Sequence, residues 1–128
     1  MPGDAGPIPP EAARELAAIA LRAAARAGDA SPASIEAVAT TRENALIVTS
    51  SGRVPGTERQ SVYLVVMKGN FILTNAPRPP RAKAPSGQYL SITFDTGTLK
   101  RLDLSLRRRA PSVPLQSVGA VSDLTRQE

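Results

Sequence analysis

The residues best suited to chemistry in this chain are basic, and most of them lie in its second half. Residues 1–64 carry six Arg or Lys against seven Asp or Glu, whereas residues 65–128 carry ten against four, so the halves contribute −1 and +6 to the net charge of +5. A positive surface attracts anionic partners. The candidate partner-binding residues are Arg78, Arg81, Lys83, Arg107, Arg108 and Arg109.

These cations form two runs, one in a proline-rich segment and one at the end of the last predicted strand. The two runs form one anion-binding surface only if the segment and the strand end lie at the same end of a sheet. Otherwise they are solvated charges that disfavour pairing at a sheet edge. The preference for arginine over lysine also fits the coding bias of a GC-rich genome. Neither run contains an aromatic residue for base stacking, because Tyr63 and Tyr89 fall within predicted strands.

Catalysis has few candidate residues in this sequence. The chain contains no cysteine and no histidine, which removes thiolate nucleophiles, imidazole bases and the usual zinc ligands. Asp95 and Asp103 are the only acids between Glu58 and Asp123, and two carboxylates can share acid and base roles. The competing interpretation makes Asp95 a turn former and Asp103 an exposed strand residue beside Arg101. We therefore predict no catalytic residues, no cofactor and no metal site.

The clearest predicted element is a helix from Pro10 to Ala27. Proline at the first helical turn and Gly28 after the last are typical helix boundaries, and the intervening residues favour helix. Spacings of three and four residues predict a narrow apolar stripe that faces a sheet. The predicted stripe consists of Leu16, Ile19, Ala20, Ala23 and Ala27.

The middle of the chain alternates between strand and helix signals. Residues 35–40 favour a strand. Thr40 with Glu43 at capping-box spacing favours a short helix over residues 41–48, although the apolar residues 46–48 also fit a strand. Val62 to Met67 is apolar on both faces, which is typical of a central strand. Gly69 is expected to form a bulge or bend before residues 71–73.

The second half predicts a loop, a hairpin and a tail. Residues 75–87 are too rich in proline for a sheet and form a semi-rigid basic loop. Residues 89–95 and 99–106 alternate and flank the turn 95–98, which predicts a hairpin. Leu102, Leu104 and Leu106 are expected to share one face. The tail has apolar stretches at 113–115 and 118–124 that are expected to pack along an edge.

These elements predict one α+β domain over residues 10–106, with a flexible lead-in at 1–9 and a basic, proline-containing tail at 107–128. The expected architecture is one N-terminal helix packed on a four-stranded antiparallel sheet, with a short second helix and an irregular tail.

The predicted order of helix, strand and three further strands ending in an Asp-Thr-Gly hairpin resembles the PepSY-like and cystatin-like architectures over residues 10–106. Residues 37–42, residues 62–71 and Phe94-Asp95 with the following Thr-Gly are also similar to small actinobacterial proteins of uncharacterised function. These motifs are structural, not catalytic. The resemblance implies a binding or inhibitory module, often extracytoplasmic.

Three hypotheses about function follow. The first is a binding module for a protein or peptide partner, with the basic loop as its contact surface and an uncovered sheet edge that could accept a strand. The second is binding of nucleic acid or another anionic polymer, and the third is an enzyme with an unfamiliar carboxylate or hydroxyl site. No stretch approaches the ~18 apolar residues of a membrane span, so a soluble protein is expected. We expect a cytoplasmic location if Met1 is the native start, and an extracytoplasmic one if a leader was removed.

Overall fold

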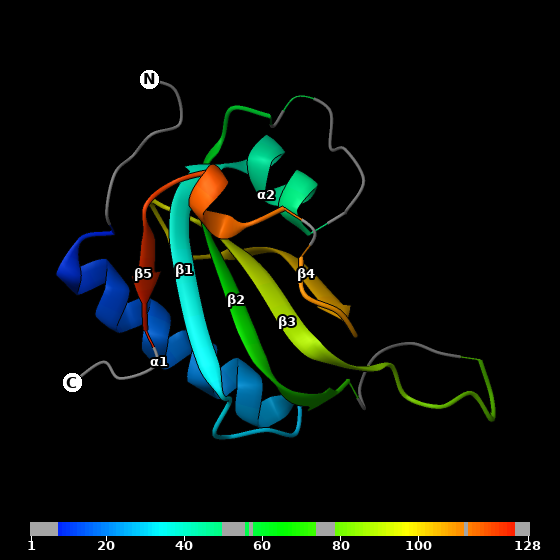
Figure 1. Ribbon diagram of the computed structural model, residues 1–128. Coiled ribbons are helices and arrows are strands. Elements are labelled where there is room, and N and C mark those ends of the chain that lie inside the picture. Colours follow the sequence, from blue (N-terminus) through cyan, green and yellow to red (C-terminus); the bar gives the residue numbers. More distant parts are fainter. Residues whose placement is uncertain (1–7, 50–55, 57, 74–78, 112, 125–128) are drawn as a thin grey trace.

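The computed structural model describes residues 8–49, 56, 58–73, 79–111 and 113–124 of this chain. A five-stranded antiparallel sheet has the strand order β4-β3-β2-β1-β5, with the helix α1 on one face and the short helices α2 and η1 on the other (Figure 1). The bounds are α1 Pro10–Arg26, β1 Ser34–Thr41, α2 Arg42–Val48, β2 Ser61–Ile72, β3 Ser86–Asp95, β4 Arg101–Arg107, η1 Leu115–Ser117 and β5 Val121–Asp123. The predicted α+β class is confirmed.

The helix α1 covers one face of the sheet with small side chains. Gly28 follows the C-cap Ala27, and its φ of +94° and hydrogen bond to the Ala25 carbonyl (3.1 Å) stop the helix. The buried stripe is rotated slightly from the predicted one, because Ile19 and Ala23 lie at its margin. The buried residues within α1 are Ala13, Leu16, Ala17, Ala20 and Ala24. Alanine on this face lets the helix axis lie close to the strands.

The strand β2 occupies the centre of the sheet and is buried on both faces. Tyr63, Val65 and Met67 face α1, whereas Val62, Leu64 and Val66 face α2. A strand covered on both sides is expected to be a continuous apolar run, which is the pattern found in the sequence. The prediction of a central strand at residues 62–67 is confirmed.

A bulge near Gly69 interrupts the pairing of β2 with β3, as the sequence predicted. The register shifts between Lys68 and Phe71, and the Asn70 amide donates to Oδ2 of Asp29 (2.9 Å). A Cβ atom at position 69 would lie 2.5 Å from that carboxylate oxygen and 3.0 Å from the Phe71 ring. A side chain at position 69 would therefore displace the Asp29 carboxylate from the place where the turn after α1 approaches β2.

The strand β3 begins earlier than predicted. Ser86 and Gly87 were assigned to the basic loop, but they pair with Ile72 and Phe71. Gly87 has no side chain at a position where a Cβ would lie 2.5 Å from the Arg107 carbonyl oxygen. The close approach of β4 to β3 explains how a glycine joins this strand.

The hairpin of β3 and β4 is confirmed, but the common phase of the β4 leucines is wrong. The register shifts between Thr93 and Phe94, which leaves Leu102 as an additional residue in β4. Leu102 therefore packs against the α2 side of the sheet, whereas Leu106 packs on the α1 side. A bulge in one strand reverses the facing of every residue beyond it.

The short helix α2 and its N-cap each begin one residue later than predicted. The hydroxyl of Thr41, not that of Thr40, accepts a hydrogen bond from the Asn44 amide (3.3 Å). The Thr40 hydroxyl instead accepts from the Asn44 side chain (3.2 Å). The helix then packs Ala45 and Val48 on the face opposite α1.

The tail adds a fifth strand to the four that were predicted. Leu115 of η1 is buried against the α2 side of the sheet, and β5 pairs with β1 at the edge opposite β4. A Cβ at Gly119 would lie 2.5 Å from a methyl group of Val38, so the tail runs close over β1. No helix among the described residues is long and apolar enough to cross a membrane.

Candidate functional site

The carboxylate of Asp95 is committed to the turn between β3 and β4. Oδ2 accepts hydrogen bonds from the amides of Gly97 (3.0 Å) and Thr98 (2.9 Å), and Oδ1 accepts one from Gln60 (3.2 Å). These donors stabilise the charged form, so the Gln60 amide and then Thr98 hold the pKa of Asp95 below its ordinary value. The interpretation of Asp95 as a turn former is confirmed.

This lowered pKa predicts an acid-dependent contribution of Asp95 to stability. The contribution is complete above the pKa of an unfolded aspartate, about 3.9, and is lost as the pH falls through the lower pKa of the folded protein. We expect Asp95→Asn to lower the unfolding free energy at neutral pH. In acid, the unfolding free energies of the variant and the wild type are expected to become more similar. Urea unfolding over a pH series checks this, and parallel curves for the two proteins would contradict it.

Asp103 is paired with Arg42, which corrects the prediction of an exposed residue beside Arg101. Nε and Nη2 of Arg42 donate to the two carboxylate oxygens at 3.0 and 2.9 Å, a two-point contact between α2 and β4. Both side chains are mostly buried. Asp95 and Asp103 each make contacts that stabilise the fold, and neither lines the three grooves described below.

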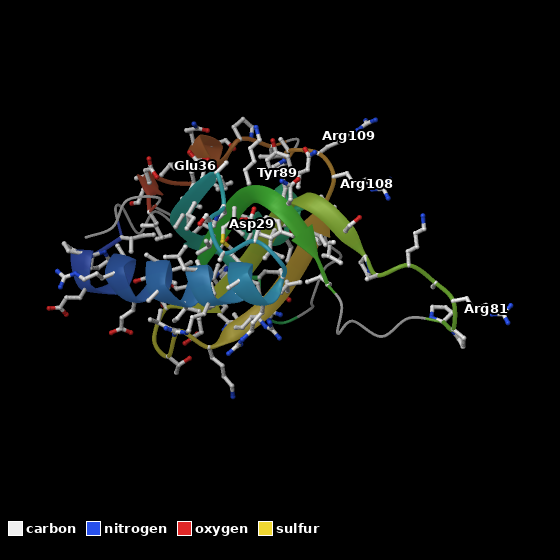
Figure 2. All side chains as sticks on the ribbon, turned by 90° about the horizontal axis from the view of Figure 1, so that it is seen from below. Asp29, Glu36, Arg81, Tyr89, Arg108 and Arg109 are labelled. Carbon is white, nitrogen blue, oxygen red and sulfur yellow. The ribbon has the colours of Figure 1, made fainter. Side chains whose placement is uncertain are left out.

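The two predicted basic runs lie at the same end of the sheet but are separated in space. Arg78 lies outside the described residues. Arg81 and Lys83 are exposed on the loop before β3, and Figure 2 shows Arg81 at the tip of this loop, far from Arg108. The arginine triplet 107–109 begins with the last residue of β4, where Arg107 pairs with Tyr89 near the start of β3.

The arginine triplet lines a groove of about 400 Å³ on the α2 side of the sheet. We call it the arginine groove. Its walls and floor are Val48, Thr49, Tyr89, Ser91, Arg107, Arg108, Arg109, Ala110 and Pro111. Arg107 donates to the Thr49 carbonyl (3.4 Å), so this arginine also contacts the end of α2. The groove combines positive charge with apolar walls and three hydroxyl-bearing residues, Thr49, Tyr89 and Ser91.

Tyr89 is the residue of this groove that the sequence analysis did not connect with the arginines. The pairing of Tyr89 with Arg107 places the partly exposed ring beside the triplet, although eighteen positions separate the two residues in the chain. Figure 2 shows Tyr89 on the same side of the molecule as Arg108 and Arg109. The available signal was the alternation of β3, which directs Tyr89 and Ser91 away from its apolar face.

Two further grooves adjoin this site. One, of about 300 Å³, shares Tyr89 and Pro111 with the arginine groove and is lined by Glu36 and Lys68, which carry opposite charges. The other, of about 370 Å³, lies at the start of β3 and includes Arg108. In the part of the chain that the structure describes, no three Asp or Glu side chains group together to hold a metal ion.

Comparison with known proteins gives no match: no protein-family model, no curated protein and no solved structure is similar to this chain. The resemblance to PepSY-like and cystatin-like domains therefore stays an expectation. The function has to be inferred from the site itself.

Proposed function

We propose that this protein is a binding module that recognises an acidic segment of a protein partner in the arginine groove. The observation that carries the proposal is the arrangement of three consecutive arginines around one groove that also contains Tyr89. The basic loop predicted as the contact surface is not part of the proposed site, because Arg81 lies far from Arg108 of the groove.

The chemistry of the groove favours carboxylates carried on a peptide. Arginine presents a planar fork of donors that matches a carboxylate at two points, and apolar walls such as Val48 and Pro111 accommodate adjacent aliphatic groups. A concave site of a few hundred Å³ accepts a few side chains of a peptide. Such a partner also agrees with the binding or inhibitory module that the resemblance implies.

Nucleic acid is the second candidate, and the position of Tyr89 favours it. A partly exposed ring beside arginines can stack a base while the cations contact phosphates. The carboxylate of Glu36 in the adjoining groove would repel the phosphates of a polyanion that continued across this face. Titration with a single-stranded oligonucleotide at two salt concentrations separates the two candidates. Nucleic acid would be favoured if the oligonucleotide bound more tightly than an acidic peptide and if Tyr89→Ala weakened its binding.

Selection from a displayed library of random peptides tests the proposal. Peptides retained by the wild-type protein are expected to be enriched in Asp and Glu. For a selected peptide, replacing Arg107, Arg108 and Arg109 with alanine is expected to raise the Kd by about tenfold to a hundredfold, because several charge-assisted hydrogen bonds are lost. Fluorescence anisotropy at physiological salt measures the Kd.

A matched control removes the same charge from another face. Arg14, Arg22 and Arg26 are exposed on α1, so their replacement by alanine lowers the net charge equally without touching the groove. We expect this control to change the Kd by less than about twofold. Equal losses in the two triple variants would reduce the binding to general charge attraction and overturn the proposed site.

A further inference from the structure

The outer edge of β4 has no strand beside it among the described residues. β4 is the terminal strand of the sheet and pairs with β3 on its inner side. Figure 1 shows it at the opposite side of the sheet from β5. An edge strand of this kind presents backbone donors and acceptors to any added chain.

The hydrogen bonds identify which backbone groups face outward. The Asp95 amide donates to the Lys100 carbonyl (2.9 Å), so the Asp95 backbone faces β4. Facing alternates along a strand, and Ser91, four residues earlier, therefore also faces β4. Ser91 pairs with Ser105. The N–H and C=O of Ser105 point toward β3, and those of its two chain neighbours point away from the sheet.

Those neighbours are Leu104 and Leu106, whose backbone groups provide an outward donor and acceptor at each residue. The Leu104 side chain is 37% exposed, which supplies an apolar contact at the middle of the edge. Positive charges stand at both ends of β4, with Lys100 and Arg101 at its start and the arginine triplet 107–109 at its end.

The charges determine which occupant the edge fits. Two copies paired antiparallel about Leu104 would place Arg101 of one chain beside Arg107 of the other, and like charges at such positions are destabilising. Charged residues at its ends and the bulge at Leu102 also disfavour pairing of this edge with the same edge of a second copy. An extended segment with acidic residues has the complementary charge.

We propose that an acidic segment of the partner binds in extended form as an added strand on β4. Its backbone pairs with Leu104 and Leu106, and its carboxylates contact the arginine groove at the end of the same strand. This inference rests on the proposed function and specifies its binding mode, since acidic residues could also reach the groove without strand pairing.

Amide hydrogen exchange tests the strand pairing in the unmodified protein. The probe is a labelled peptide with a run of glutamates followed by alternating valine and threonine. We expect saturating probe to slow exchange at Leu104 and Leu106 by about tenfold or more, because their amides gain hydrogen bonds. The Ser105 amide, already directed toward β3, is the internal control and is expected to change little.

Two proline variants separate the outward and inward positions. Leu104→Pro removes an outward donor and is expected to keep the wild-type melting temperature within a few degrees, while raising the Kd of the probe by about tenfold. Ser105→Pro removes a donor to β3 and is expected to lower the melting temperature. Circular dichroism and anisotropy provide the two readouts.

The outcomes distinguish the two proposals. Probe binding that depends on the arginine triplet, with exchange at Leu104 and Leu106 unchanged, would overturn strand addition and leave the proposed function intact. Absence of any probe binding to the wild type would overturn both. Binding accompanied by slower exchange at Leu104 and Leu106 would support both.

Discussion

Replacing Phe71 with alanine is expected to lower the unfolding free energy by about 3–5 kcal/mol. Phe71 is only 1% exposed, and its ring lies against the bulge at Gly69 in the core below α1. Truncation would leave a cavity where the end of β2 pairs with β3. Urea unfolding at neutral pH measures the change.

Ile72→Ala is the matched control for Phe71→Ala. Ile72 is the next residue of β2 and is 48% exposed, so its truncation removes apolar surface without opening a cavity. We expect a loss below about 1 kcal/mol. Similar losses for the two variants would contradict the facing assigned to β2 beyond its bulge.

Replacing Leu16 with alanine is expected to cost about 2–5 kcal/mol. Leu16 is 0% exposed and is the largest buried side chain of α1, whose other buried positions are all alanine. Because alanine is the best helix former, the substitution leaves helix propensity unharmed and reports packing alone. The loss is a large fraction of the 5–15 kcal/mol typical of a domain.

Leu21→Ala on the same helix is the control for Leu16→Ala. Leu21 is 42% exposed, and its truncation is expected to change the unfolding free energy by about 0.5 kcal/mol or less. A larger effect at Leu21 than at Leu16, in urea unfolding monitored by circular dichroism, would show that α1 packs through a different face.

The elements with strong local signals were predictable from the sequence. The helix α1 has proline at its start, glycine at its end and a run of helix-forming residues between them. The strand β2 combines β-branched residues with an uninterrupted apolar run, which identified both its type and its central position. In each element, the local preference and the burial agree.

Features that depend on strand register were not predictable. The fifth strand is only three residues long and exists because Leu115 and Gly119 bring the tail against β1. The facing of Leu102 depends on a bulge, and a one-residue shift reverses a side chain without changing the alternation seen in the sequence.

Some residues of the arginine groove, the candidate site, were singled out in the sequence and others were not. The arginine triplet was identified from its charge alone, but its neighbour Tyr89 belongs to another strand and joins it only through the pairing of β3 with β4. The contact between Arg42 and Asp103 spans sixty-one positions. Such contacts follow from the topology, which no local pattern encodes.

Chemical-shift mapping with a selected acidic peptide tests the central claim most directly. The isotope-labelled protein is titrated with the peptide, and the backbone amide shifts are followed to saturation. The arginine groove predicts the largest changes at Tyr89, Ser91 and residues 107–109. Largest changes on α1 or at the β5 edge, with those amides unmoved, would contradict it.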